Sequence, residues 1–243
     1  VEREERIRKF VARTYFEVHA TFDAKAGQYA GRWFDEKFKK NDDEHARAER
    51  IFDTPDAAKA DAKARAQAIA AKCQGKLGTV EEESKPTTQA PPLLYDLTSL
   101  QREANSRFGF SARTTLSLAQ ALYEKHKVLT YPRTDARALP EDYVKTVGQT
   151  LEQLEETNRY GQFAREIRTK KYVRGNNKRV FDNTKISDHF AIIPTLQLPK
   201  ALNELEEKLY DLVVKRFLAV FYPSAEFQQT TRITRVEGEA FKS

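Results

Sequence analysis

The sequence contains little or none of several residue types and patterns, and each absence excludes a class of protein. One cysteine, Cys73, occurs in 243 residues, which excludes an internal disulfide and fits a reducing compartment. No run of about 20 apolar residues exists, so no segment is expected to span a membrane. The chain also has no secretory signal pattern at its start. These absences leave a globular protein without covalent cross-links.

Methionine is absent as well, and the chain opens at Val1 in a charged run. Residues 237–243 have the composition of a strand that is cut off in mid-course. Both features predict that the sequence is a piece of a longer protein. What is present is 40% hydrophobic and 32% charged, with a net charge of +6 and a pI near 9.2. This balance predicts one large or two ordinary domains with a modest core, and it leans toward polyanionic partners.

Alternation of apolar and polar residues predicts β-structure near the start of the chain. Residues 15–22 and 29–34 read as two strands of a hairpin. Thr54-Pro55-Asp56 predicts the start of an alanine-rich helix that runs to Lys72. Residues 77–83 read as a further strand. The proline-rich stretch 84–92 then reads as an extended connector and a domain boundary.

The middle of the chain predicts helices instead. Residues 95–107 and a helix capped by Ser111 are joined by Phe108-Gly109-Phe110, which makes a helix-turn-helix shape. Pro140 opens another helix, and leucines from 202 onward mark an amphipathic one. Alternation returns over 226–236. We therefore expect an α+β fold, with a discontinuous β-rich domain (1–90 and 198–243) and an inserted helical domain (91–197), the crossings lying at 84–92 and at 194–199.

The most informative stretch is Tyr131-Pro132-Arg133-Thr134-Asp135, which we expect directly after the second helix. Proline disfavours the α conformation at the residue before it, so Tyr131 should lie at a helix-to-loop junction. Arg133 presents a permanent, planar cation that fits a phosphate. A tyrosine beside such an arginine favours covalent attack on a phosphodiester. The alternative is structural, with Tyr131 in a core and Arg133 paired with Asp135.

Two further features bear on this chemistry. His189 is able to bind a phosphate or move a proton, or it is a satisfied structural histidine. The basic segment 168–179 is either a solvated loop or a loop that contacts phosphates. No histidine has an arginine three residues later, as a tyrosine recombinase would need, and no His-hydrophobic-His, zinc cluster or phosphate-binding glycine loop occurs.

Three stretches resemble motifs of the type IA DNA topoisomerases. Tyr131–Asp135 resembles the active-site motif, residues 92–105 look like the segment before it in the topoisomerase III branch, and Ser187–Thr195 is similar to a downstream Asp-His-His-Ala-Ile-Ile-Pro-Thr motif. Two departures occur, because Phe190 replaces the second histidine and Ala138 replaces a tyrosine. The order of the motifs makes the resemblance specific.

The resemblance implies roles for individual residues. Tyr131 maps onto the nucleophile, Arg133 onto the residue that stabilises charge at the scissile phosphate, and His189 onto the histidine that positions that phosphate. Residues that would shape the DNA pocket or contact the DNA backbone are Thr134, Asp135, Asp188 and Arg113. No metal ligand is assigned in this chain.

The resemblance also implies a setting. The chain would carry the arch domain and a nucleophile domain with a winged-helix or CAP-like helix-turn-helix, whereas the catalytic acids, a lysine and the Mg²⁺ ligands would belong to a Toprim domain outside it. The implied partners are single-stranded DNA and the other domains of the parent chain, with no membrane, in the cytoplasm and at the nucleoid of a bacterium. One strand would be cut through a 5′-phosphotyrosine, another strand passed, and the break resealed without ATP.

Since the ordinary pKa of a phenol is about 10, it is a weak nucleophile at neutral pH, and we expect this chain alone to be inactive. Two other interpretations remain open. One is a non-catalytic clamp for single-stranded DNA, and the other is a docking arch with no nucleic-acid role.

Overall fold

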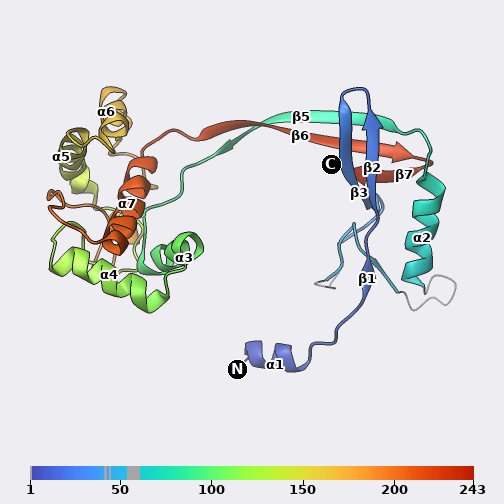
Figure 1. The fold of residues 1–243 in the computed structure, drawn as a ribbon, viewed down its shortest axis with the longest axis horizontal. Helices are drawn as coiled ribbons and strands as arrows, with labels where there is room; N and C mark the ends of the chain where they lie inside the picture. The colour runs from blue at the N-terminus through green and yellow to red at the C-terminus, as the bar shows by residue number, and fades with distance from the viewer. Residues whose placement is uncertain (1, 41–42, 44, 54–60) are drawn as a thin grey trace. The chain divides into compact units, whose positions relative to one another are not determined.

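The computed structural model describes residues 2–40, 43, 45–53 and 61–243. The chain divides into two compact units, each with its own apolar core. A β-rich unit joins the residues up to Thr87 with Phe227–Ser243, and a helical unit comprises Thr88–Glu226. Figure 1 labels helices α3–α7, which lie in the second unit, and helices α1 and α2, which lie in the first. The predicted α+β fold is confirmed, with the β-rich unit built from discontinuous segments.

The predicted hairpin is present at the start of the β-rich unit. Strands β2 (His19–Ala24) and β3 (Gly27–Phe34) pair in antiparallel register, with Phe22 opposite Tyr29. The first predicted strand is divided, however, because β1 (Tyr15–Phe16) pairs with the short β4 (Ile51–Phe52) in a separate sheet.

The main sheet has the strand order β2-β3-β7-β6-β5. Strand β7 (Glu239–Lys242) lies between β3 and β6 (Ala225–Val236) and pairs with both in antiparallel register. Glu237 and Gly238 both have positive φ, which is the turn that a tight hairpin needs. The last strand of the chain is therefore a central strand of this sheet.

The stretch 84–92 is not only a connector. Strand β5 (Thr79–Gln89) continues through most of it, with every residue exposed, and Ser84 bonds Thr230 of β6 side chain to side chain at 2.7 Å. Pro86 is tolerated here because β5 is an edge strand, where one missing N–H donor leaves no interior ladder broken.

One described helix of the β-rich unit packs on the short sheet of β1 and β4. Helix α2 (Ala62–Cys73) begins after Asp61, whose carboxylate accepts from the Ala64 N–H at 3.0 Å; the start predicted at 54–56 lies outside the described residues. Its buried side contributes to a core that comprises Val18, Trp33, Ile51, Ala62, Ala66, Val236 and Phe241. The short N-terminal helix α1 (Glu2–Arg8) buries no residue.

The helix-turn-helix is present in the helical unit. Helix α3 (Leu97–Phe108) begins later than predicted because Asp96 and Ser99 form a reciprocal cap. Gly109 ends the helix in the left-handed conformation (φ 71°), and Ser111 caps helix α4 (Ala112–Glu124). Local turn chemistry thus sets both helix boundaries.

The remaining helices complete a larger core. They are the 3₁₀ turn η2 (Glu141–Tyr143), α5 (Val144–Glu155), α6 (Gly161–Thr169), the 3₁₀ turn η3 (Asn183–Lys185) and α7 (Glu204–Ala219). Helix α6 was not predicted.

Helix α7 corrects the second predicted boundary between the two parts of the chain. Its Leu209, Val213 and Phe217 are fully buried in the core of the helical unit. Because this apolar face needs the other helices to cover it, residues 198–226 belong with the helical unit rather than with the β-rich one. The chain leaves the helical unit at Glu226, within β6.

Candidate active site

Tyr131 lies on an extended segment rather than at the end of a helix. Helix α4 ends at Glu124, where the Val128 N–H reaches back to the Leu122 carbonyl at 2.9 Å and Lys127 adopts a left-handed φ of 58°. Such a left-handed residue ends a helix by itself. The expectation that Pro132 stops the helix at Tyr131 is therefore wrong.

Backbone hydrogen bonds join this extended segment to the downstream motif. Thr130 donates from its N–H to the Ile193 carbonyl at 3.0 Å, and its hydroxyl donates to the Ala191 carbonyl at 3.0 Å. The Ile193 N–H in turn donates to the Thr130 hydroxyl at 2.9 Å. Residues 128–139 and 191–195 thus hold each other in place on either side of the tyrosine.

The upstream motif joins the same arrangement. The Leu97 N–H donates to the Thr134 carbonyl at 3.0 Å, and the Ile192 N–H donates to the Tyr95 carbonyl at 2.8 Å. The three stretches that the sequence singled out therefore meet in space, although they are separated by tens of residues. Their meeting point is built from main-chain bonds, which many side-chain substitutions leave intact.

Tyr131 packs against two other rings. Its ring lies 4.3 Å from that of His189, centroid to centroid, and 5.4 Å from that of Tyr123 in an edge-to-face arrangement. Tyr131 is half-buried and His189 is exposed. The Thr134 hydroxyl donates to the His189 carbonyl at 2.9 Å, which fixes the histidine backbone against the tyrosine segment.

Arg133 is exposed and forms no ion pair with Asp135 among the described residues. Its guanidinium lies against Gln120 of α4, whose amide oxygen, turned toward it, accepts from Nη2 and Nε at 3.0 and 3.2 Å. Asp135 instead accepts from the Ser187 hydroxyl at 3.3 Å. The ion pair that the structural interpretation of the pentapeptide predicted is therefore absent. No carboxylate neutralises the positive charge of Arg133 within the described chain.

Two predicted DNA contacts are not joined to this group. Asp188 is exposed beside His189, and within the described chain it has no side-chain bond. Arg113 is exposed on the first turn of α4, seven residues and so about 10 Å along the helix axis from Gln120.

Sequence reasoning missed Gln120 and Tyr123. Both lie near the C-terminal end of α4, next to its buried face, and contact the tyrosine segment from there. Their spacing of three residues places them on one side of the helix, and this spacing is the sequence feature that could have indicated a shared contact.

Other tyrosines of the helical unit are poorer nucleophiles. Burial raises the pKa of the Tyr210 phenol to about 12 and raises that of Tyr95 and Tyr160 further above the ordinary range. At Tyr160 the nearby Asp211 carboxylate, which accepts from the phenol at 3.0 Å, raises the pKa further. Each of these hydroxyls is enclosed in the core, out of reach of a polymer substrate.

The residues of the described chain do not fit a metal site. No group of three or more His, Cys, Asp or Glu side chains converges within it.

Among the described residues, no helix combines the length and the apolar character that a membrane-spanning segment needs.

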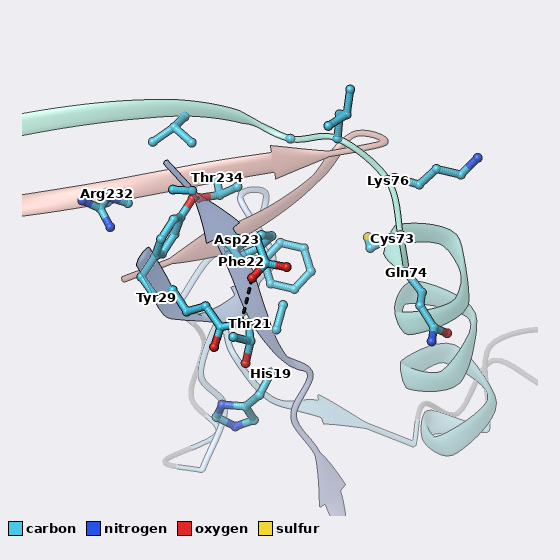
Figure 2. A pocket seen from close by; sticks show the side chains of 18 of the residues that line it. His19, Thr21, Phe22, Asp23, Tyr29, Cys73, Gln74, Lys76, Arg232 and Thr234 are labelled. Carbon is cyan, nitrogen blue, oxygen red and sulfur yellow. Dashed lines mark hydrogen bonds between the residues drawn. The ribbon is translucent and has the colours of Figure 1, made fainter. Parts of the chain in front are cut away.

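A cavity of about 910 Å³ lies elsewhere, in the β-rich unit (Figure 2). It is bounded by the β2–β3 hairpin, the end of α2 and the start of β5, and the Tyr29 hydroxyl bonds Thr234 within it at 2.9 Å. Cys73 lies at its edge, and burial raises the pKa of that thiol. None of the predicted site residues lines this cavity.

The chain is similar to known proteins over its whole length. A family model described as DNA topoisomerase matches residues 1–243. DNA topoisomerase 3 of Shouchella clausii is 40% identical over 246 aligned residues, covering 100% of this chain and 31% of that protein. DNA topoisomerase 3 of Bacillus subtilis is 47% identical over 171 residues, covering 69% of this chain and 23% of that protein.

A solved structure has the same fold. Full-length topoisomerase I from Thermotoga maritima superposes with a TM-score of 0.59 at 24% identity, covering 100% of this chain and 35% of that one. The chain thus spans about a third or less of the length of the curated relatives that it matches. It belongs to the type IA DNA topoisomerase family, in the topoisomerase III branch.

Proposed function

We propose that this chain supplies the nucleophile of a type IA DNA topoisomerase. The Tyr131 oxygen attacks a phosphorus of single-stranded DNA and bonds to it, while the bond from phosphorus to the 3′ oxygen breaks. The phenol gives up its proton and the leaving oxygen gains one, which leaves a 5′-phosphotyrosine and a 3′-hydroxyl. Because one phosphodiester replaces another, resealing needs no ATP.

Arg133 neutralises charge on the phosphate oxygens, and His189 positions that phosphate next to the phenol. Thr134, Asp135 and Asp188 shape the pocket. The observation that carries this assignment is the 4.3 Å contact between the Tyr131 and His189 rings, beside an arginine without a carboxylate partner in the described chain.

The remaining parts of the reaction lie outside these residues. The catalytic acids, the lysine and Mg²⁺ are assigned to another domain of the parent protein, and the described residues offer no cluster for the metal. We therefore infer that this chain does not cleave DNA by itself. A second strand passes through the break before religation, within a bacterial cell and in association with its chromosome.

Adduct mapping tests the assignment. The full-length protein is incubated with a single-stranded oligonucleotide and Mg²⁺, denatured rapidly and digested, and the DNA-linked peptide is identified by mass spectrometry. We expect a 5′-phosphate on Tyr131. Bound oligonucleotide without any adduct would favour the non-catalytic clamp, and an adduct formed by residues 1–243 alone would contradict the inferred inactivity.

A further inference from the structure

The basic segment 168–179 contains two kinds of cation. Three of them are neutralised by carboxylates of the same unit, at distances of 2.5–2.9 Å: Arg168 by Glu152 and Glu155, Lys170 by Glu166, and Lys178 by Glu141. The other three, Lys171, Arg174 and Arg179, have no carboxylate partner within the described chain. The segment is therefore neither wholly a solvated loop nor wholly a binding loop.

Arg179 lines a cavity that touches the tyrosine motif. The cavity is about 340 Å³ in volume, and its wall comprises Leu93, Asp135, Arg137, Ala138, Arg179 and Lys185. Arg137 resembles Arg179 in having no carboxylate partner in the described chain. Two unneutralised guanidinium groups thus line one small cavity beside Asp135.

Both arginines are held in place by backbone carbonyls of one short stretch. Arg137 Nε donates to the Leu94 carbonyl at 3.0 Å, and Arg179 Nη2 donates to the Pro91 carbonyl at 2.8 Å. Each guanidinium has five N–H donors, so most remain available after one such bond. A pre-positioned arginine fork with free donors matches the geometry of a phosphate.

The charges of the cavity fit a phosphodiester. Lys185 is already paired with Asp182 at 2.8 Å and adds no net charge. Two arginines against the single carboxylate of Asp135 leave a net charge of one, which a singly charged phosphodiester balances. A terminal phosphate carries two negative charges, which is one more than the net positive charge of the cavity.

The cavity lies within reach of a strand held at Tyr131. Asp135 follows Tyr131 by four residues, so their α-carbons are at most about 14 Å apart. Arg179 also lines a neighbouring cavity of about 240 Å³ together with Arg174 and the rings of Tyr172 and Tyr222, which lie 5.6 Å apart. Cations next to aromatic rings are the usual elements of a track for single-stranded nucleic acid.

We propose that Arg137 and Arg179 bind a second backbone phosphodiester, in the part of the DNA strand that neighbours the phosphate attacked by Tyr131. This inference rests on the proposed function, because it takes the polymer at Tyr131 to be DNA. The two arginines would bind the DNA strand at a phosphate other than the one that reacts.

The test compares two double variants of residues 1–243 in their salt-dependent binding to a fluorescent single-stranded oligonucleotide. R137Q/R179Q removes the two unpaired arginines. The matched control, R165Q/R168Q, removes the same charge from arginines of the same unit that are already paired with Glu155. We expect the first variant to lower the slope of log K against log salt by about 0.7, because it neutralises one phosphate fewer, and the control to leave the slope unchanged. Equal slopes for all three proteins would overturn the proposal.

Oligonucleotides with one uncharged methylphosphonate linkage locate the contact. One linkage should weaken binding to the parent sequence and to the control variant but not to R137Q/R179Q. If no linkage behaves in this way, the cavity does not bind a backbone phosphate. Inorganic phosphate is added at constant ionic strength as a separate arm. If it displaces the oligonucleotide from the parent sequence but not from R137Q/R179Q, the site takes free phosphate and the DNA assignment is overturned.

Two further measurements keep the outcomes distinct. If R137Q/R179Q fails to fold, R137K/R179K takes its place, because lysine retains the positive charge but lacks the planar fork. We expect this variant to keep the salt slope and to bind the oligonucleotide less tightly. Unchanged affinity would contradict the proposal. Adduct formation at Tyr131 is measured in parallel in the full-length protein. An adduct without any change in slope refutes only the second contact, whereas a changed slope without an adduct refutes the nucleophile and keeps the contact.

Discussion

The two units bury their apolar side chains on different scales. Among the described residues, the core of the β-rich unit comprises seven buried residues, two of which lie in helix α2. The core of the helical unit comprises thirty, from five helices and the extended segments. The β-rich unit depends on its sheet ladder and on cross-strand contacts such as that of Arg232 with Glu82, at 2.5 Å. The candidate site lies in the unit with the larger core, where reacting groups are held more rigidly.

The largest expected effect separates two tyrosines, one from each unit. Tyr131→Phe should abolish covalent capture of DNA by the full-length protein, because it removes the nucleophilic oxygen alone, and should leave the thermal midpoint unchanged. Tyr29→Phe removes a hydroxyl that bonds Thr234 in the β-rich unit and should leave capture intact. Capture at the parent level by the Tyr131 variant would refute the assignment.

Matched deletions in the two cores come next. Leu151→Ala in the helical unit and Ile51→Ala in the β-rich unit each leave a cavity, so each should lower the free energy of unfolding of its own unit by about 2–5 kcal/mol. Calorimetry should show two transitions, and each variant should shift only one of them. A common shift of both transitions would mean that the units unfold cooperatively.

Arg133→Ala should slow DNA cleavage by about 10²–10³-fold, or about 3–4 kcal/mol, because it removes one preorganised cation from the attacked phosphate. Single-turnover cleavage by the full-length protein measures this. Arg165→Ala, which removes an arginine paired with Glu155 at 2.9 Å, is the control and should cleave at the parent rate. If Arg133→Ala unfolds the unit instead, the arginine is structural.

A smaller effect distinguishes two glycines of the helical unit. A Cβ at Gly161 would lie 2.4 Å from the Glu155 carbonyl oxygen, whereas one at Gly148 of α5 would meet no atom within 4 Å. Gly161→Ala should therefore destabilise the unit by about 1–3 kcal/mol through overpacking. Gly148→Ala should stabilise it by about 0.5–1 kcal/mol. Urea denaturation of both variants gives the signs.

The smallest expected effect is a dependence on pH. A hydrogen bond from Lys185, together with bonds from Thr184, lowers the pKa of Asp182 from 3.8 to about 2. Since the folded pKa is the lower one, this carboxylate stabilises the helical unit above pH 3.8, and the contribution is lost as the pH falls toward 2. Asp182→Asn should flatten the stability profile in that window and leave it unchanged between pH 5 and pH 7, relative to its own plateau.

The sequence predicted those features that local chemistry sets. The β2–β3 hairpin follows from alternation, and α3 and α4 follow from Asp96, Gly109 and Ser111. Features that depend on distant partners were missed, namely helix α6 and the continuation of β5 beyond the strand predicted at 77–83. Helix α6 has a short apolar face that packs on α5 and α7, and β5 is a strand because β6 pairs with it.

The candidate site divides in the same way. Tyr131 and Arg133 are visible in one pentapeptide, whereas His189 is 58 positions away and only its motif indicated that it lies nearby. Gln120 and Tyr123 were not found, because nothing in the sequence of a helix shows which loop packs against it. Arg137 and Arg179 were not distinguished from other cations, since the presence or absence of a carboxylate partner is a tertiary property.

The extended segment that carries Tyr131 has a consequence for mechanical load. If a DNA strand is bonded to the phenol as proposed, tension on it reaches the main chain at Tyr131. The preceding residue, Thr130, is hydrogen-bonded to Ala191 and Ile193, and these bonds tie the two segments together. Several such bonds share a pull along the segment, so no single one has to resist it. Under the proposed function, a DNA end attached to Tyr131 would therefore be held by several main-chain hydrogen bonds of the helical unit and not by the tyrosine side chain alone.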